Sequence, residues 1–139
     1  MDRNVKFSHP GINKNKILSA VNAVLPKNKA VSDYGLIFVS KQKMAELNKK
    51  YRHKKGATNV LSFGAGPSKE LGAGEVVICP KVAAEEAKSY GFTQKNWMTR
   101  LIVHGILHLA GYGHETVMAR GDMERLEKRI LYKLGIKLI

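Results

Sequence analysis

The alternation of polar and apolar residues predicts strands at four places in the chain. Residues 3–8 (RNVKFS) alternate with a period of two, which is typical of a strand with one buried face. Residues 34–39, 59–63 and 75–79 form short apolar runs that also favour strands, and the first of these is expected to lie centrally in a sheet. The glycine-rich segment GAGPSKELGAG separates the last two runs.

Five segments place apolar residues three and four positions apart, which is the spacing of amphipathic helices. Ser40 can cap one of these helices through its side-chain oxygen, and Arg52 is expected to begin the loop after it. Pro26 and Gly91 end two others. The predicted helices are 14–25, a segment from Ser40 to Tyr51, 81–90, a segment from Thr93 to about Ala110, and a C-terminal helix that stops at Gly135.

Several apolar and aromatic residues are interpreted as parts of the core. The C-terminal helix carries an apolar stripe at helical spacing, which indicates packing and not a partner-binding seam. Trp97 and Tyr112 have rings that can stack on bases, but burial is expected for both. The stripe consists of Met123, Leu126, Ile130, Leu131 and Leu134.

Length and composition limit the architecture. A chain of 139 residues, of which 44% are hydrophobic, can bury one sizeable core, so we expect a single domain over residues 1–139. We find no apolar run of membrane-spanning length and no signal or transit peptide, and therefore expect a cytoplasmic protein. The single cysteine, Cys79, excludes an internal disulfide and a four-cysteine zinc site, and is expected to be buried.

The chain carries a large positive charge. Its 24 Lys and Arg residues against 11 Asp and Glu residues give a formal net charge of +13, which favours a polyanion as partner. Nucleic acid fits better than a membrane surface, because the basic residues are spread along the chain and not gathered on one amphipathic helix. The charge alone identifies no substrate.

The stretch HGILHLAGYGH (104–114) has the composition of a metal site. His104 and His108 are four residues apart, so a helix places them on one face about a turn apart. Gly111 can take the left-handed conformation that ends a helix, and the turned chain can bring His114 back to the same ion. Three imidazoles suit zinc, although the same type of ligand also binds nickel, copper or iron.

The number of these histidines indicates the kind of metal site. Structural zinc sites are normally closed by four protein ligands, whereas three leave one coordination position for water, which points to catalysis. The metzincin proteases share the spacing, but they need a glutamate next to the first histidine as general base, and this chain has Gly105 there. A protease is therefore not expected.

Three ordered motifs resemble the YbeY-type endoribonucleases, also called rRNA maturation factors. They are LNKKYRHKKGATNVLSF (47–63), LGAGEVVICP (71–80) and HGILHLAGYGHE (104–115), and the resemblance covers most of the chain. It implies an α+β fold in which about five helices surround a four-stranded mixed sheet. It also implies a metal-dependent hydrolase that cleaves single-stranded RNA in ribosomal RNA processing and ribosome quality control, with ribosomal RNA and ribosomal proteins as partners.

The resemblance also assigns site residues. The family's metal ligands fall on His104, His108 and His114, and its functionally important arginine falls on Arg52. The metal would assist cleavage of the phosphodiester while Arg52 stabilises charge on the phosphate.

Two positions depart from the family pattern. Gly113 replaces the usual aspartate before the third histidine, which puts the tuning of the site in doubt, and Glu75 stands where aspartate is common. Neither the nucleophile nor a general base follows from the sequence. Glu75 and Glu115 are the candidates for an acid, a base or a residue that supports a ligand.

A non-catalytic alternative is a zinc-stabilised RNA-binding or ribosome-docking module, which explains the positive charge equally well. A fourth protein ligand such as Glu115 or His53 would close the metal site and favour that alternative.

Overall fold

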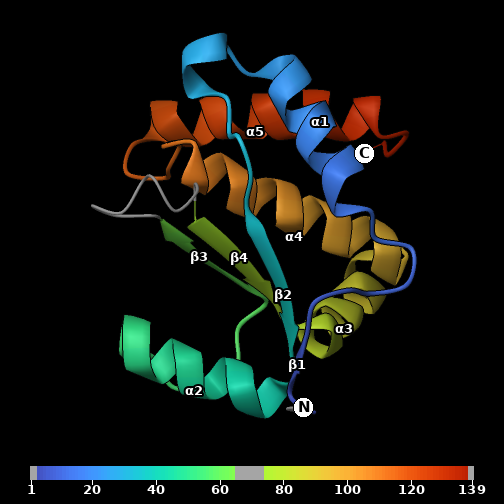
Figure 1. The fold of residues 1–139 in the computed structure, drawn as a ribbon, viewed down its shortest axis with the longest axis vertical. Coiled ribbons are helices and arrows are strands. Elements are labelled where there is room, and N and C mark those ends of the chain that lie inside the picture. The colour runs from blue at the N-terminus through green and yellow to red at the C-terminus, as the bar shows by residue number, and fades with distance from the viewer. Residues whose placement is uncertain (1–2, 65–73, 138–139) are drawn as a thin grey trace.

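The computed structural model describes residues 3–64 and 74–137, which contain a four-stranded mixed sheet (Figure 1). The strand order is β1-β2-β4-β3, where β2 and β4 run parallel and the other pairs are antiparallel. The predicted mixed sheet is thus confirmed, and β2 lies inside it as expected. Residues 65–73, which include the start of the second motif, lie outside the described residues. The strands are β1 (Val5–Lys6), β2 (Gly35–Val39), β3 (Val60–Gly64) and β4 (Gly74–Ile78).

The described residues form five α-helices and one short 3-10 helix, close to the prediction. Asn13, Ser40, Thr93 and Thr116 each cap a helix by accepting a backbone N–H on the side-chain oxygen. The first strand is shorter than the predicted 3–8. The helices are α1 (Lys14–Val24), η1 (Lys27–Lys29), α2 (Lys41–Arg52), α3 (Pro80–Tyr90), α4 (Gln94–Leu109) and α5 (Val117–Lys133).

The prediction that Arg52 begins a loop is wrong, because Arg52 is the last residue of α2. The helix continues to Arg52 because His53, with a left-handed φ of 56°, donates its N–H to the Lys49 carbonyl and closes the last turn. A non-glycine residue in this conformation costs about 1–2 kcal/mol, so the surrounding contacts must hold the turn.

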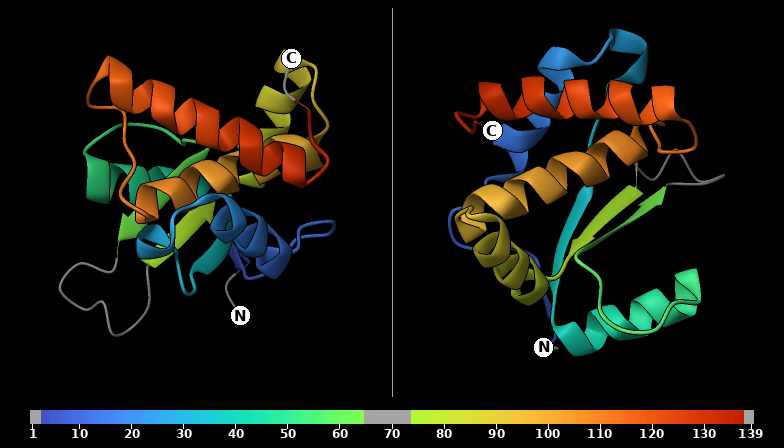
Figure 2. Two further views of the ribbon diagram at one scale, coloured as in Figure 1. Left: turned by 90° about the horizontal axis from the view of Figure 1, so that it is seen from above. Right: turned by 180° about the vertical axis from the view of Figure 1, so that it is seen from behind.

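The helices lie on both faces of the sheet (Figures 1 and 2). Helix α2 covers one face, where Met44 packs with Leu61, Val77 and Cys79. Helix α4 lies against β3 and β4 on the other face, and α1, α3 and α5 pack around it. Cys79 is fully buried, as predicted.

The C-terminal helix packs as expected. Met123, Ile130 and Leu131 are buried in the core on the α4 side of the sheet, and Gly135 has the left-handed φ of 80° that suits a helix stop. Trp97 and Tyr112 are partly buried against the same core. None of the helices in the described part of the chain combines the length and apolar character needed to traverse a lipid bilayer.

Gly105 lets α4 lie unusually close to the sheet. A Cβ atom at this position would lie 2.7 Å from Cγ1 of Val76 and 3.0 Å from Oγ of Ser62. The Ser62 hydroxyl also donates a hydrogen bond of 3.1 Å to the Gly105 carbonyl. Helix α4 therefore meets β3 and β4 through backbone and short side chains at the level of His104.

We expect Gly105→Ala to destabilise the protein. Alanine favours a helix over glycine by up to about 1 kcal/mol, but overpacking a core typically costs about 1–3 kcal/mol, and the branched Val76 side chain has little freedom to retreat. Urea denaturation should show a lower free energy of unfolding.

The matched control is Gly121→Ala on α5, where a Cβ meets only an Arg125 nitrogen at an ordinary 3.5 Å. This substitution should leave the free energy of unfolding unchanged or raise it. If Gly105→Ala proved as stable as Gly121→Ala, the close approach would not be a packing constraint.

Candidate metal centre

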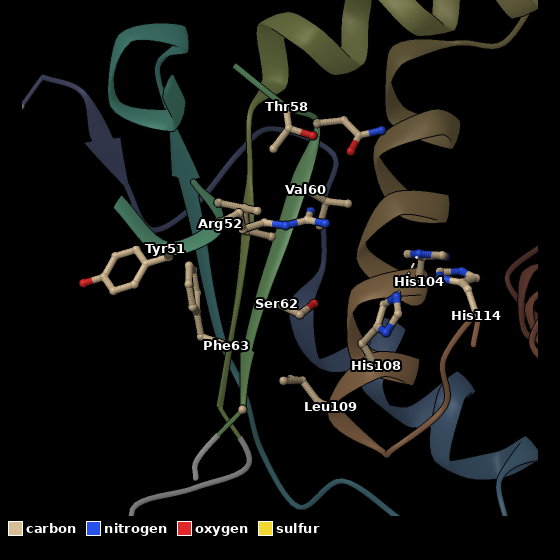
Figure 3. A pocket seen from close by; sticks show the side chains of 13 residues that line it. Tyr51, Arg52, Thr58, Val60, Ser62, Phe63, His104, His108, Leu109 and His114 are labelled. Atoms are coloured by element: carbon tan, nitrogen blue, oxygen red, sulfur yellow. Dashed lines mark hydrogen bonds between the residues drawn. The ribbon is translucent and has the colours of Figure 1, made fainter. Parts of the chain in front are cut away.

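The three predicted histidines lie together beside β3 (Figure 3). His104 and His108 project from one face of α4, with ring centroids 4.7 Å apart. His114 follows α4 in the chain, and its ring centroid lies 4.9 Å from both of the others. The predicted convergence of these side chains is present.

A tight turn after α4 returns the chain to the cluster. The N–H of Gly111 donates to the His108 carbonyl, and that of Tyr112 donates to the Leu107 carbonyl, each at 3.0 Å. This pair of bonds defines a Schellman motif, which needs a left-handed residue at Gly111, whose φ is 99°. The glycine in HLAGYGH therefore has the predicted conformation.

The nitrogen atoms of this cluster suit a metal ion. One ring nitrogen from each histidine lies within 4.8 Å of the other two, and the Nε2 atoms of His104 and His108 are 3.1 Å apart. A tetrahedral zinc ion with bonds of about 2.0–2.1 Å sets its ligand nitrogens about 3.3 Å apart, so small movements complete the site. Among the described residues this group contains no fourth ligand, and neither His53 nor Glu115 joins it.

The environment favours the neutral form of His108, which is the form that binds metals. Burial lowers the pKa of the His108 imidazole, and the neighbouring His104 and His114 lower it further. His108 thus stays deprotonated at a lower pH than a free imidazole would.

Glu127 on α5 supports the first histidine, a role that the sequence interpretation missed. Glu127 is 6% exposed, and one of its carboxylate oxygens lies 3.2 Å from Nδ1 of His104. A carboxylate there favours a proton on Nδ1 and leaves Nε2 with a free electron pair toward the cluster. The sequence does contain a sign of this role. Glu127 lies four residues after Met123 and three before Ile130, so it falls on the buried apolar face of the helix, where a charged residue needs a partner.

Glu127 keeps its charge despite burial. Burial alone raises the pKa of its carboxyl, but hydrogen bonds and charges from His104 and Arg100 outweigh this effect and lower the pKa overall. The Nε atom of Arg100 donates to the other carboxylate oxygen at 3.0 Å. The ionised Glu127 carboxylate therefore stabilises the folded protein at a pH above the ordinary carboxyl pKa. This contribution to the free energy of unfolding is lost as the pH falls through the lowered pKa.

A cavity of about 660 Å³ opens between the histidines and the end of α2, a volume within the range of roughly 300–1,000 Å³ typical of ligand sites. It runs along β3, which within the described residues pairs only with β4 and so forms an edge of the described sheet. Figure 3 shows Arg52 extending from α2 across this strand into the cavity. The structure thus brings Arg52 and the histidines together.

The two candidate carboxylates are placed differently. Glu75 is exposed and shares its face of β4 with Val77, which packs toward α2, whereas Val76 faces α4 and the histidines. Glu75 lines neither of the described cavities. Glu115 lies beside the site with its carboxylate against Gly113, but this exposed side chain is free to turn away, so nothing in the structure explains why position 113 is glycine.

Two polar side chains missed by sequence analysis line the cavity. Ser62 bonds to the Gly105 carbonyl, and the Asn59 amide donates to the Glu86 carboxylate at 3.1 Å. Both occur in the motif ATNVLSF, where the interpretation considered only a strand. The period of that strand would have placed Val60 and Ser62 on the same face.

Comparison with known proteins gives consistent matches over most of the chain. The family model described as endoribonuclease YbeY matches residues 5–135. The endoribonuclease YbeY of Bartonella quintana is 40% identical over 126 residues, covering 87% of this chain and 80% of that protein. The endoribonuclease YbeY of Thermodesulfovibrio yellowstonii is 42% identical over 125 residues, covering 87% and 77%.

The fold also has a solved counterpart. The solution structure of TM1509 from Thermotoga maritima aligns with a TM-score of 0.60, covering 87% of this chain and 83% of that one. At 23% sequence identity, this likeness supports the fold alone.

We expect Glu127→Gln to weaken metal binding. The amide keeps the shape of the side chain but loses the negative charge that orients His104, and loss of such a supporting group typically lowers metal affinity about 10–100-fold. Zinc affinity can be measured by competition with a chromophoric chelator. Glu124→Gln, on the same helix and outside the histidine contacts, should bind zinc as the wild type does. Equal affinities in both variants would contradict the role of Glu127.

Proposed function

Because this chain belongs to the endoribonuclease YbeY family, we propose that it cuts single-stranded RNA in ribosomal RNA maturation and ribosome quality control, using its histidine cluster and Arg52. The observation that carries the proposal is the shared cavity, in which three imidazoles and one arginine face the same space. The net charge of +13 supports a polyanionic substrate.

His104, His108 and His114 would hold one metal ion, for which we propose zinc. Bound there, the ion would supply Lewis acidity toward a phosphoryl oxygen or activate a water. The three imidazoles contribute neutral nitrogen donors, and Glu127 fixes the orientation of His104. The absence of a fourth donor among the described residues leaves room for a substrate oxygen or water, as a catalytic site requires.

Arg52 would bind the phosphate that undergoes cleavage. Its guanidinium is planar and can donate to two phosphate oxygens at once, which a lysine cannot reproduce. No ion pair or side-chain hydrogen bond occupies it within the described residues, so its donors are available. Charge that builds on the phosphate would then meet a fixed positive group.

The non-catalytic alternative, a zinc-stabilised RNA-binding or ribosome-docking module, is not favoured by the family membership. Its distinguishing feature was a fourth protein ligand at the metal, and neither His53 nor Glu115 belongs to the group of possible ligands.

Several finer assignments belong to the same proposal. Ribosomal RNA as the target, ribosomal proteins as partners, a cytoplasmic location and a single domain over residues 1–139 all stay predictions. Glu115 stays the candidate acid or base, since it lies beside His114 in the chain, whereas Glu75 lies away from the cavity.

The proposal is tested by the joint loss of metal and cleavage. In His108→Ala, the zinc content of purified protein and the cleavage of a ribosomal RNA fragment should both fall sharply, because two imidazoles hold zinc poorly. His9→Ala removes a histidine outside the cluster and should change neither. Full cleavage by metal-free His108→Ala would exclude the proposed chemistry.

Arg52→Ala should separate catalysis from metal binding. Arginine is not a metal ligand, so zinc content and fold should persist, while cleavage at saturating RNA should fall about a hundredfold or more, as when a stabiliser of transition-state charge is removed. Arg52→Lys should recover little of the rate.

The control for lost charge is Lys49→Ala, an exposed residue on α2 that lies outside the cavity. It should retain most of the cleavage rate. A normal rate in Arg52→Ala, or an equal loss in Lys49→Ala, would refute the assignment of Arg52.

A further inference from the structure

A second cavity adjoins the histidine cluster on its other side. It has a volume of about 280 Å³ and lies between α4 and α5. Asn59, Val60, His104 and His114 line both cavities, so the two spaces meet at the histidines. A strand of RNA lying along the Arg52 cavity would therefore reach the second cavity after passing the cluster.

Arg100 is held rigidly at the wall of this second cavity. Its Nε atom donates to Glu127 at 3.0 Å, and its guanidinium lies 5.1 Å from the centre of the Trp97 ring. Trp97 is itself fixed, because its Nε1 atom donates to Glu86 at 3.0 Å and its ring stacks on Tyr90. The side chain thus loses little further entropy when a ligand binds.

The outer end of the Arg100 guanidinium has unused donors. A guanidinium carries five N–H groups, and the contacts found in the described residues use only the one on Nε. The four on the terminal nitrogens can bind an oxyanion, and the bond to Glu127 fixes the plane in which they lie. This is the arrangement in which arginine recognises phosphate.

Arg120 adds a second positive charge to the same cavity. It lies in the first turns of α5, is exposed, and forms no ion pair within the described residues. Two carboxylates also line the cavity, of which Glu127 is already paired with Arg100 and His104. Glu124 is unpaired in the described residues and should oppose an anion.

We propose that this cavity is a second phosphate subsite, in which Arg100 and Arg120 bind a phosphodiester of the RNA that flanks the linkage at the histidines. The inference rests on the proposed function, since it takes single-stranded RNA as the ligand. The strand then has an arginine on each side of the cluster, Arg52 on one and Arg100 with Arg120 on the other. The subsite fixes the register of the RNA and takes no part in bond cleavage.

Arg120→Ala is the informative variant, because Arg100→Ala would also leave the buried Glu127 without a partner. Arg129→Ala is the matched control: it removes the same charge from an exposed position on the same helix, away from both cavities. The probe is a labelled 2′-O-methyl oligouridine of about ten nucleotides, a length typical of single-strand sites. Its affinity for the zinc-loaded protein is measured by fluorescence anisotropy at several salt concentrations.

Arg120→Ala should weaken binding of this probe about tenfold, the scale of a hydrogen bond to a charged group. The slope of log affinity against log salt should become shallower by about 0.7, as expected for one lost phosphate contact on a single strand. Arg129→Ala should change both quantities much less, and Glu124→Gln should strengthen binding. With cleavable RNA, Arg120→Ala should raise KM and leave kcat near the wild-type value.

A neutral methylphosphonate linkage, moved along the probe one position at a time, locates the contact. One position should weaken binding to the wild type and to Arg129→Ala, and should weaken binding to Arg120→Ala distinctly less, because only Arg100 still contacts that linkage in this variant. Equal losses in Arg120→Ala and Arg129→Ala, or no such position, would overturn the subsite while leaving the proposed function intact if the wild type still cleaves RNA. Failure of the wild type to cleave RNA would refute the proposed function, and the anisotropy comparison would still decide the subsite.

Discussion

The contact between α4 and the sheet at Gly105 positions the histidine cluster against β3. Because residue 105 has no side chain, the helix rests on Val76 and Ser62, and His104 next to it is brought beside β3. His108, one turn later, and the Schellman turn at Gly111 follow from the same placement. A larger residue would lift the helix away from the strand that carries the cavity wall. Gly105, whose presence argued against a protease, is thus explained by the close packing of α4 on the sheet.

The second constraint is the buried charge of Glu127. An isolated carboxylate with so little exposure would be costly, but His104 and Arg100 lie one helical turn apart on α4 and bond to its two oxygens. The same carboxylate therefore orients a prospective metal ligand and an arginine, and joins α5 to α4 through them. The fold and the site share this group, so the packing of the C-terminal helix is not separable from the chemistry of the cluster.

The sequence predicted the local structure and the histidine cluster because both depend on short-range patterns. The cap at Ser40, the helix start at Thr93, the stop at Gly111 and the spacing of His104 and His108 each depend on only a few neighbouring residues. Contacts between distant segments were not predictable in this way. The helical pattern marks Glu127 as a charge within the buried stripe but does not identify His104 as its partner, because that pairing depends on how α5 packs on α4. The placement of Glu75 on the face of β4 away from the cluster likewise depends on strand register.

Arg52 shows how the arrangement of layers makes such a site possible. It belongs to α2, which covers the opposite face of the sheet from the histidines, so its side chain can reach them only around an edge strand. β3 is that strand, and its outer side faces the cavity and carries no neighbouring strand in the described sheet. An open edge normally invites unwanted pairing with other chains, and a strand of five residues limits that risk. If another strand covered β3, it would separate Arg52 from the histidines, so the open edge of the described sheet is what lets residues from its two faces line one cavity.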